Sequence, residues 1–262
     1  MKLFLGITLL ACSFFSVAQE SSLKILSYNI KHGKGMDGKF SVERIAEVIR
    51  AQHPDLVALQ EVDKNCKRSK NTDTPAKLGR LLKMEHCFGK TINLGEGEYG
   101  VAILSRFPIK KSTVHKLPKG GEPRVALEAV VETKCGLLSL VTTHLDWTNK
   151  KVRTQQVKTI VEEMNKRTHP VILAGDFNAP RASDTMQLLV KAGWNVLKKN
   201  DGSSIRTFHG EKDREISATA EREEIDFIVL KDFEETEVKH GVIQELVASD
   251  HRPIYAEIRK GK

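Results

Sequence analysis

The amino-acid sequence lacks the features that mark several classes of protein. Its 262 residues contain no internal repeat, no low-complexity tract and no linker-like stretch rich in proline, glycine or serine. Only four cysteines occur, and their spacings match no zinc motif, so a thiol-bound zinc site is not expected. Aromatic residues make up 6% of the chain and do not interleave with a basic stripe, which argues against processive binding of nucleic acid.

What is present suits a soluble globular protein of one large domain or two small ones. Hydrophobic residues make up 40% of the chain and charged residues 29%, enough to bury a sizeable core. The formal net charge is +8 at pH 7, and a moderately basic surface favours acidic partners such as nucleic acid, phosphorylated sugars or anionic lipid.

The N-terminus predicts export to the periplasm or the exterior. Residues 1–18 contain one lysine, an uncharged apolar run and then Ser16-Val17-Ala18, as in a secretory signal peptide cut after Ala18. A membrane anchor is less favoured because the run is short and lacks a basic flank. A lipoprotein signal ending at Cys12 is less favoured because apolar residues follow it. Residues 19–262 are expected to form a single domain, with no other segment apolar enough to cross a bilayer.

Three cysteines follow the predicted leader. They are Cys66, Cys87 and Cys135, and the sequence leaves open whether Cys66 and Cys87 form a disulfide.

Strands and helices alternate along much of the chain. A β-α-β unit is predicted by strands at 23–30 and 55–62 around a helix at 41–52 that Ser41 can cap. Further helices are expected at 74–84, 153–167 and 183–193, and further strands at "YGVAILS", "VALEAVVET", "LLSLVTTHLDW", "VILAGDF", "EIDFIVL" and "RPIYAEI". The pattern predicts an α/β fold with two packed sheets and helices outside them.

Polar residues stand at the ends of several predicted core strands. They are Asn29, Gln60, Glu61, His144, Asp146, Asp176, Asn178, Asp226, Asp250 and His251. Burying unpaired carboxylates is costly, so such residues are tolerated where strand ends meet each other, a metal ion and solvent. Carboxylate and amide oxygens suit Mg²⁺ or Mn²⁺ rather than Zn²⁺, and the two histidines supply acid–base groups. This chemistry fits metal-assisted attack of water on phosphorus.

Five motifs carry a resemblance to a known family. "SYNI", "LQEVD", "AGDFNAP", "EIDFIVL" and "SDHRPI", in this order from about Leu23 to Ile258, resemble the endonuclease/exonuclease/phosphatase superfamily, which includes DNase I-like enzymes. The resemblance implies a four-layer α/β sandwich, two packed mixed β-sheets flanked by helices, and a Mg²⁺-dependent (or Mn²⁺-dependent) phosphoesterase.

The resemblance also implies roles for the metal side of the site. Glu61 would be the main metal ligand, Asn29 would lie at the metal and touch substrate, and Asp250 would be a further ligand or a metal-side carboxylate. Asp176 would hold or deprotonate the attacking water, and Asn178 would bind the phosphate. Whether one ion or two take part is left open.

The remaining roles concern the substrate. His251, oriented by Asp226, would stabilise the phosphoryl charge or act as general base in place of Asp176. His144 in "THLDW" would be the leaving-group acid, with a satisfied core histidine as the alternative. Arg124 in "PRVAL" would clamp phosphate unless it is a simple salt-bridge partner, and His32 would line the mouth.

The substrate itself is left open. A nuclease and a phosphoesterase acting on a phospholipid head group or a sugar phosphate both fit, while absence of a "WCDR"-type segment disfavours an inositol 5-phosphatase. "RTFHG" at 206–210 is expected to shape specificity. The rival from another class is a non-catalytic binding module on the same fold. No stable protein partner is evident, and a monomer is expected.

Overall fold

The computed structural model describes residues 22–199, 206–210, 224–233 and 236–260. The predicted signal peptide at residues 1–18, with the alternative anchor at Cys12, lies outside these residues and stays a prediction. No helix in the described ranges is long and apolar enough to cross a bilayer.

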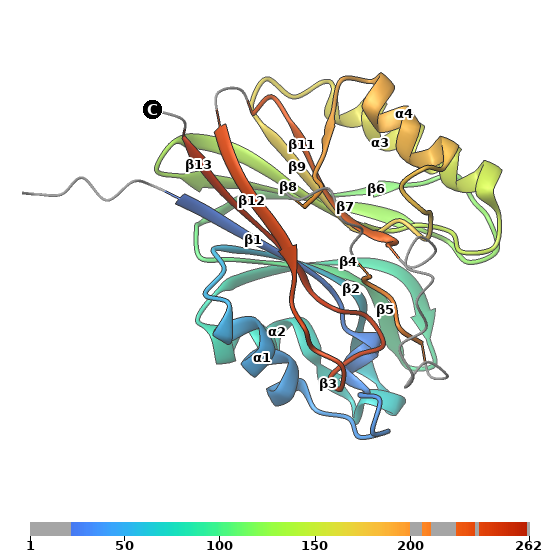
Figure 1. The fold of residues 1–262 in the computed structure, drawn as a ribbon. Helices are drawn as coiled ribbons and strands as arrows, with labels where there is room; N and C mark the ends of the chain where they lie inside the picture. The colour runs from blue at the N-terminus through green and yellow to red at the C-terminus, as the bar shows by residue number, and fades with distance from the viewer. Residues whose placement is uncertain (1–21, 200–205, 211–223, 234–235, 261–262) are drawn as a thin grey trace, which may run out of the picture.

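Two mixed sheets form the centre of the fold (Figure 1). The described strands of the first sheet run in the order β12 (Thr236–Val242), β13 (Ile254–Lys260), β1 (Ser22–Asn29), β2 (Leu56–Cys66), β5 (Gly97–Ser105) and β4 (Glu85–Leu94), with β3 (Thr72–Asp73) beside β2. Those of the second run β10 (Asn195–Val196), β11 (Asp226–Lys231), β9 (Val171–Asp176), β8 (Gly136–His144), β7 (Val125–Thr133) and β6 (Ile109–Lys116).

Each sheet contains one parallel pair of neighbouring strands near its middle. These pairs are β1 with β2 and β8 with β9, whereas the other described pairings are antiparallel. The β7–β8 hairpin is the one that the sequence predicts. Parallel neighbours end at the same edge of their sheet, which matters for the polar residues at those ends.

Helices cover the outer face of each sheet, so the predicted four-layer sandwich is confirmed (Figure 1). The helices α1 (Val42–Ala51) and α2 (Thr74–Leu82) lie on the first sheet, and α3 (Lys150–Met164) and α4 (Asp184–Lys191) lie on the second. Two short 3-10 turns, η1 (Lys31–Gly33) and η2 (Lys67–Ser69), follow β1 and β2.

The helix ends follow capping chemistry. Ser41 caps α1 and Ser183 caps α4, each accepting a hydrogen bond from a backbone N–H three residues ahead. The helix predicted at 153–167 instead begins at Lys150, because the Asn149 side chain caps it by accepting from two backbone N–H groups.

The core between the sheets becomes polar at one end. Along β9, Ile172, Ala174 and Asp176 occupy alternate positions, so all three point to the same face of the strand. Ile172 and Ala174 belong to the apolar core that both sheets share. Asp176, only 1% exposed, therefore stands where that core ends.

The Cys66–Cys87 disulfide that the sequence leaves open does not form. Cys66 and Cys87 both carry free thiols. Cys66 is instead directed to the backbone, with its Sγ 3.2 Å from the carbonyl oxygen of Glu98.

Candidate active site

Strand register brings three predicted site residues together on the second sheet. The parallel pairing of β8 with β9 sets His144 opposite Asp176, and the antiparallel pairing of β9 with β11 sets Asp226 opposite Asp176. Residues paired across strands point to the same face, so the three side chains form one row. All three are buried, with Asp226 3% and His144 8% exposed.

The first sheet supplies Asn29 and Glu61 to the same edge. Asn29 ends β1 and pairs with Gln60 of β2. The register of β2 against β5 then shifts between Leu59 and Val62, which is a β-bulge, and Glu61 takes a positive φ of 54° within it. A bulge re-aims the side chain it carries, and strained backbone of this kind is concentrated at functional sites.

Two features fix this arrangement, one between the sheets and one within the second sheet. The Gln60 amide crosses between them and donates a hydrogen bond of 2.9 Å to the Thr142 hydroxyl of β8. Gly175 precedes Asp176 where β9 lies tightly against β8, and a Cβ at Gly175 would stand 2.1 Å from the carbonyl oxygen of Thr143. Glycine is therefore required in "AGDFN" for strand contact.

The Asn29 amide links the two rows of residues. Its Nδ2 atom donates to Glu61 Oε1 and to Asp176 Oδ2, both at 3.1 Å. Its Oδ1 atom accepts from the backbone N–H of Lys31, also at 3.1 Å. Asn29 therefore fixes the positions of two carboxylates from different sheets.

His251 and Asp226 form a buried pair. The His251 Nδ1 atom lies 2.9 Å from Asp226 Oδ2, and its Nε2 atom lies 3.7 Å from Asp176 Oδ2. Burial alone would lower the pKa of His251, but the charge of Asp226, its hydrogen bond and the nearby Asp176 and Asp250 carboxylates outweigh burial and raise that pKa to about 10. The ring is therefore an imidazolium at neutral pH, and it lies against Phe208 with 4.9 Å between ring centres.

The pKa values of Asp176 and His144 are shifted in opposite directions from their ordinary values. Burial, reinforced by the charge of Asp226, raises the pKa of Asp176 to about 7. Burial, with the charges of Arg124 and His251, holds the pKa of His144 well below 6.5. The His144 Nε2 atom lies 3.5 Å from Asp176 Oδ2. A carboxyl group and a neutral imidazole thus lie close together, a combination typical of acid–base sites.

The family model for the Endonuclease/Exonuclease/phosphatase family matches residues 26–251, most of the chain. This chain belongs to that family. The family signature ends at His251, so it spans every predicted site residue from Asn29 onward. Members of the family are mostly metal-dependent phosphoesterases.

Known proteins similar to this family member differ in what is established for them. An uncharacterised Escherichia coli K12 protein, YbhP, is 27% identical over 204 residues, covering 72% of this chain and 80% of its own. An endonuclease/exonuclease/phosphatase from Beutenbergia cavernae is 24% identical with a TM-score of 0.78, covering 92% of this chain and 72% of its own. A mannosyl-6-phosphatase from Bacteroides thetaiotaomicron is 18% identical with a TM-score of 0.70, covering 90% and 99%.

The donor set of this family member suits a metal ion. Ligand atoms of Asp176, Asp226 and His251 all lie within 4.8 Å of one another, so this cluster could hold one. The His251 ring already pairs with Asp226 through Nδ1, which leaves only its Nε2 atom for an ion. Glu61 offers a better donor, because it accepts a single hydrogen bond, from Asn29, and its second oxygen has no hydrogen-bond partner among the described residues.

Asp250, the third predicted metal residue, is engaged by a cation. Its Oδ2 atom lies 2.9 Å from the Nζ atom of Lys31, and its Oδ1 atom lies 3.4 Å from the Ser249 hydroxyl. Its charge nevertheless reaches the other residues of the site, since it contributes to the raised pKa of both Glu61 and His251.

Arg124 and Tyr99 form the wall of the site beside Glu61. Arg124 is 5% exposed and its Nη1 atom pairs with Glu122 at 2.9 Å, while its buried Nε atom has no partner among the described residues. Burial and the charge of Glu61 raise the pKa of Tyr99, and Arg124 acts in the opposite direction. Arg124 is thus a salt-bridge partner of Glu122, and its role as a phosphate clamp stays a prediction.

His32 lies farther along the same wall. It has a positive φ of 47°, and its buried Nδ1 atom has no partner in the described part of the chain. Burial and the charge of Arg68 lower the pKa of His32 to about 4. Arg68 stacks on the Tyr99 ring, 5.4 Å from its centre, and donates twice to Asp63 at 2.8 and 2.7 Å. Neither Tyr99 nor Arg68 is predicted as a site residue from the sequence.

Asn178 and Asp146 shape the loops around the site. Asn178 has a positive φ of 49°, its backbone N–H donates to Asp176 Oδ1 at 2.9 Å, and its Nδ2 atom donates to the Leu145 carbonyl at 3.1 Å. Asp146 accepts from Gly121 and from the turn that starts α3, which is a structural role.

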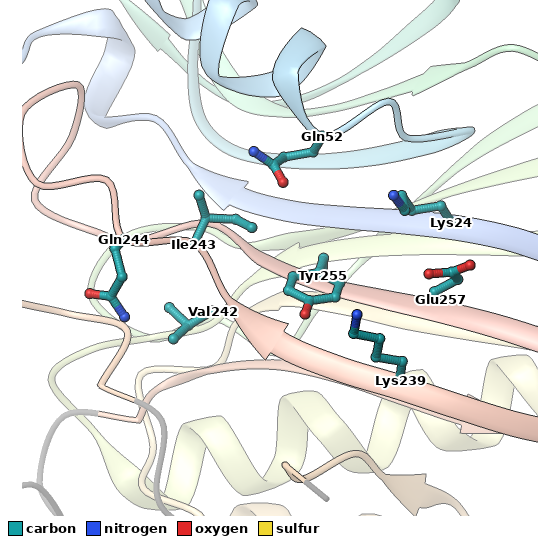
Figure 2. Close-up of a pocket in the computed structure, with 8 residues that line it drawn as sticks. All are labelled: Lys24, Gln52, Lys239, Val242, Ile243, Gln244, Tyr255 and Glu257. Atoms are coloured by element: carbon teal, nitrogen blue, oxygen red, sulfur yellow. The ribbon is translucent and has the colours of Figure 1, made fainter.

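A hollow of about 420 Å³ lies elsewhere, on the outer face of the first sheet (Figure 2). Lys24 lines it from the start of β1, the end opposite to Asn29, together with Lys239, Tyr255 and Glu257. The hollow is therefore separate from the carboxylate–histidine site of this family member.

Proposed function

We propose that this protein hydrolyses a phosphate ester by metal-assisted attack of water. The observation that carries the proposal is the convergence of Asn29, Glu61 and Asp176, within two hydrogen bonds of each other, on the buried Asp226–His251 pair. Family membership supports the same reaction class.

The carboxylate of Glu61 would be the main ligand of a Mg²⁺ or Mn²⁺ ion, with Asp250 on the same side and Asn29, which orients Glu61, beside the ion. Hard oxygen donors favour these ions over zinc. When bound, the ion would polarise a phosphoryl oxygen and stabilise the leaving oxygen.

The protein's own side chains would supply the proton transfers and the positioning. Asp176, whose pKa is about 7, is poised to accept a proton from the attacking water. The His251 imidazolium, held by Asp226, would donate from Nε2 to a phosphoryl oxygen and offset its charge. His144 would donate a hydrogen bond toward the leaving oxygen and gain basicity as the phosphate anion arrives.

Donors beside these groups would bind the rest of the phosphate ester. The Nε atom of Arg124 and the Asn178 side chain are suited to phosphoryl oxygens, and His32 would contact the alcohol portion of the substrate. The substrate is a phosphorylated sugar, a phospholipid head group or a nucleic acid. Similarity to a mannosyl-6-phosphatase supports including a phosphorylated sugar among these candidates.

Hydrolysis of bis-p-nitrophenyl phosphate and p-nitrophenyl phosphate, with Mg²⁺ or with EDTA, tests the proposal. We expect turnover that stops on chelation. Asp176→Asn should lower kcat by about 10²-fold or more, whereas Asp184→Asn, a matched change at an exposed position on α4, should not.

The rival is a binding module without catalysis. Inert protein in the presence of Mg²⁺ and Mn²⁺, toward both esters and toward plasmid DNA, sphingomyelin, inositol phosphates and mannose 6-phosphate, would favour that rival and overturn the proposal.

A further inference from the structure

A row of charged side chains crosses the outer face of the first sheet, along the hollow that Figure 2 shows. Glu257 of β13 pairs with Lys24 of β1 on one side and with Lys239 of β12 on the other. Residues paired across antiparallel strands point to the same face, so the two lysines flank the carboxylate. All three side chains line the hollow, which therefore has a charged end.

The carboxylate in this row is already engaged by an arginine. The Arg259 Nη2 and Nε atoms lie 2.8 and 3.2 Å from Glu257 Oε1. This contact, with smaller contributions from Lys24 and Lys239, holds the pKa of Glu257 below its usual range. Neither lysine ammonium makes a hydrogen bond or an ion pair with the described residues. The lining of the hollow is thus left with an excess of positive charge.

Other carboxylates near the row do not remove this excess. Asp55 accepts a hydrogen bond of 2.9 Å from the backbone N–H of Lys24, and its side chain has Arg106 as a partner at 3.8 Å. Glu237 lies outside the lining, opposite Arg259 in the register of β12 and β13. An anion that enters the hollow would therefore meet two ammonium groups without partners.

An aromatic ring forms the floor of the hollow beside the charged end. Tyr255 pairs with Gly241 across β13 and β12, and a Cβ at Gly241 would stand 2.9 Å from the Cε1 and hydroxyl atoms of Tyr255. The missing side chain is what lets the tyrosine ring lie across β12. Val242 and Ile243 continue the apolar lining beyond it. A surface of this kind packs against the carbon face of a small organic ring.

Two carboxamides complete the lining. Gln52 caps the C-terminal end of α1, and Gln244 follows β12 (Figure 2). Neither side chain makes a hydrogen bond with the part of the chain that the structure describes. A carboxamide both donates and accepts, so it matches hydroxyl groups. Cations, an aromatic face and amides together match the phosphate, the ring and the hydroxyls of a phosphorylated sugar.

We propose that this hollow is a second ligand site, which binds a sugar phosphate with its phosphate group at Lys24 and Lys239. The two lysines are two strand spacings apart, about 10 Å between backbones, so their side chains can reach one phosphate. The sugar ring lies on Tyr255. The inference is independent of the proposed function, because no residue of the hollow belongs to the carboxylate–histidine site.

Nuclear magnetic resonance mapping of backbone amides tests this on nitrogen-15-labelled protein kept free of metal with EDTA. The probe is mannose 6-phosphate, and the comparison ligands are mannose and inorganic phosphate. One variant combines Lys24→Met with Lys239→Met. A second, Gly241→Ala, displaces the tyrosine ring without changing any charge. The matched control combines Lys111→Met with Lys116→Met, two exposed lysines on β6 of the other sheet.

We expect mannose 6-phosphate to shift the amides of β12 and β13 around the hollow, with a Kd at least about tenfold below that of either comparison ligand. The double lysine variant should raise this Kd by about tenfold or more, and Gly241→Ala by about threefold or more. The β6 control should stay within about twofold of wild type.

The opposite results are equally definite. Shifts confined to the segments around Asp176 and His251, unchanged affinity in the double lysine variant, or equal affinity for mannose or for inorganic phosphate would overturn the inference. If the double lysine variant does not fold, as judged by circular dichroism, Gly241→Ala decides the question. A protein that hydrolyses no phosphate ester would overturn the proposed function and leave this inference standing.

Discussion

Replacing Asp226 by asparagine should lower the pKa of His251 in the metal-free protein. The two side chains are 3% and 4% exposed, and the ring Nδ1 atom lies 2.9 Å from the carboxylate. Asparagine keeps the size of the side chain and removes its charge, so the change tests electrostatics more than packing.

The size of the effect follows from the pKa of His251. Its rise from 6.5 to about 10 corresponds to roughly 5 kcal/mol of preference for the charged ring, at about 1.4 kcal/mol per pH unit. Asp226 is the largest of the influences that raise the pKa, and burial opposes it. In Asp226→Asn we expect the pKa of His251 to fall by about two units, because the Asp176 and Asp250 charges still favour the charged ring.

The direction for stability follows from the same values. A group whose folded pKa lies above its unfolded pKa stabilises the fold fully below the unfolded value, here 6.5, and loses that contribution as pH rises through about 10. The wild-type contribution from His251 should therefore decline from about pH 6.5 and be lost above about pH 10, and Asp226→Asn should have lost most of it already at neutral pH.

The assay is a nuclear magnetic resonance titration of protein labelled with nitrogen-15 in histidine, kept free of metal with EDTA. His251→Gln assigns the resonance by removing it. Asp232→Asn, an exposed aspartate just past the same strand, is the control. A His251 pKa in Asp226→Asn within one unit of wild type would refute the assignment of Asp226 as its main electrostatic partner.

Three further predictions concern stability and rate. Glu128→Gln should lower the free energy of unfolding in urea by about 3–5 kcal/mol, because the buried carboxylate accepts two hydrogen bonds from Arg167 at 2.6 Å. These bonds hold the pKa of Glu128 low, so the wild type should lose this contribution as the pH falls below about 4. A loss under about 1 kcal/mol would contradict a stabilising role for the pair. Gly175→Ala should lower stability by about 1–3 kcal/mol in the same assay, since its Cβ would meet the Thr143 carbonyl; an unchanged midpoint would be evidence against that contact. His144→Gln should lower kcat by about 10²–10⁴-fold with little change in the unfolding midpoint, and a normal kcat would exclude its role.

The strands that the sequence predicts are those with a strong apolar signal. β9 is fully buried, and its apolar residues form a continuous run in the sequence. β6, β12 and β4 are not predicted, because they lie at or next to sheet edges and many of their residues are exposed. Buried and exposed side chains do not alternate regularly along these strands. Hydrophobic periodicity alone therefore does not distinguish them from loops.

The site residues that could be predicted from the sequence are those that stand in a recognisable motif. Asn29, Glu61 and Asp176 each stand at the end of an apolar strand, and the structure brings them within hydrogen-bonding distance. Tyr99 and Lys31 could not be found this way. Tyr99 is an ordinary core residue of β5 in the sequence, and Lys31 gains its meaning only from Asp250, far along the chain.

The charges of the site leave an excess of negative charge that a divalent ion could offset. Four carboxylates meet there among the described residues, namely Glu61, Asp176, Asp226 and Asp250. Lys31 and His251 offset two of those charges, and the charge of Arg124 is balanced by Glu122. A divalent ion bound as proposed would offset the remainder and favour release of the Asp176 proton that the metal-free site partly retains. The proposed general base would therefore become active only when the ion is bound, which couples metal binding to proton transfer at Asp176.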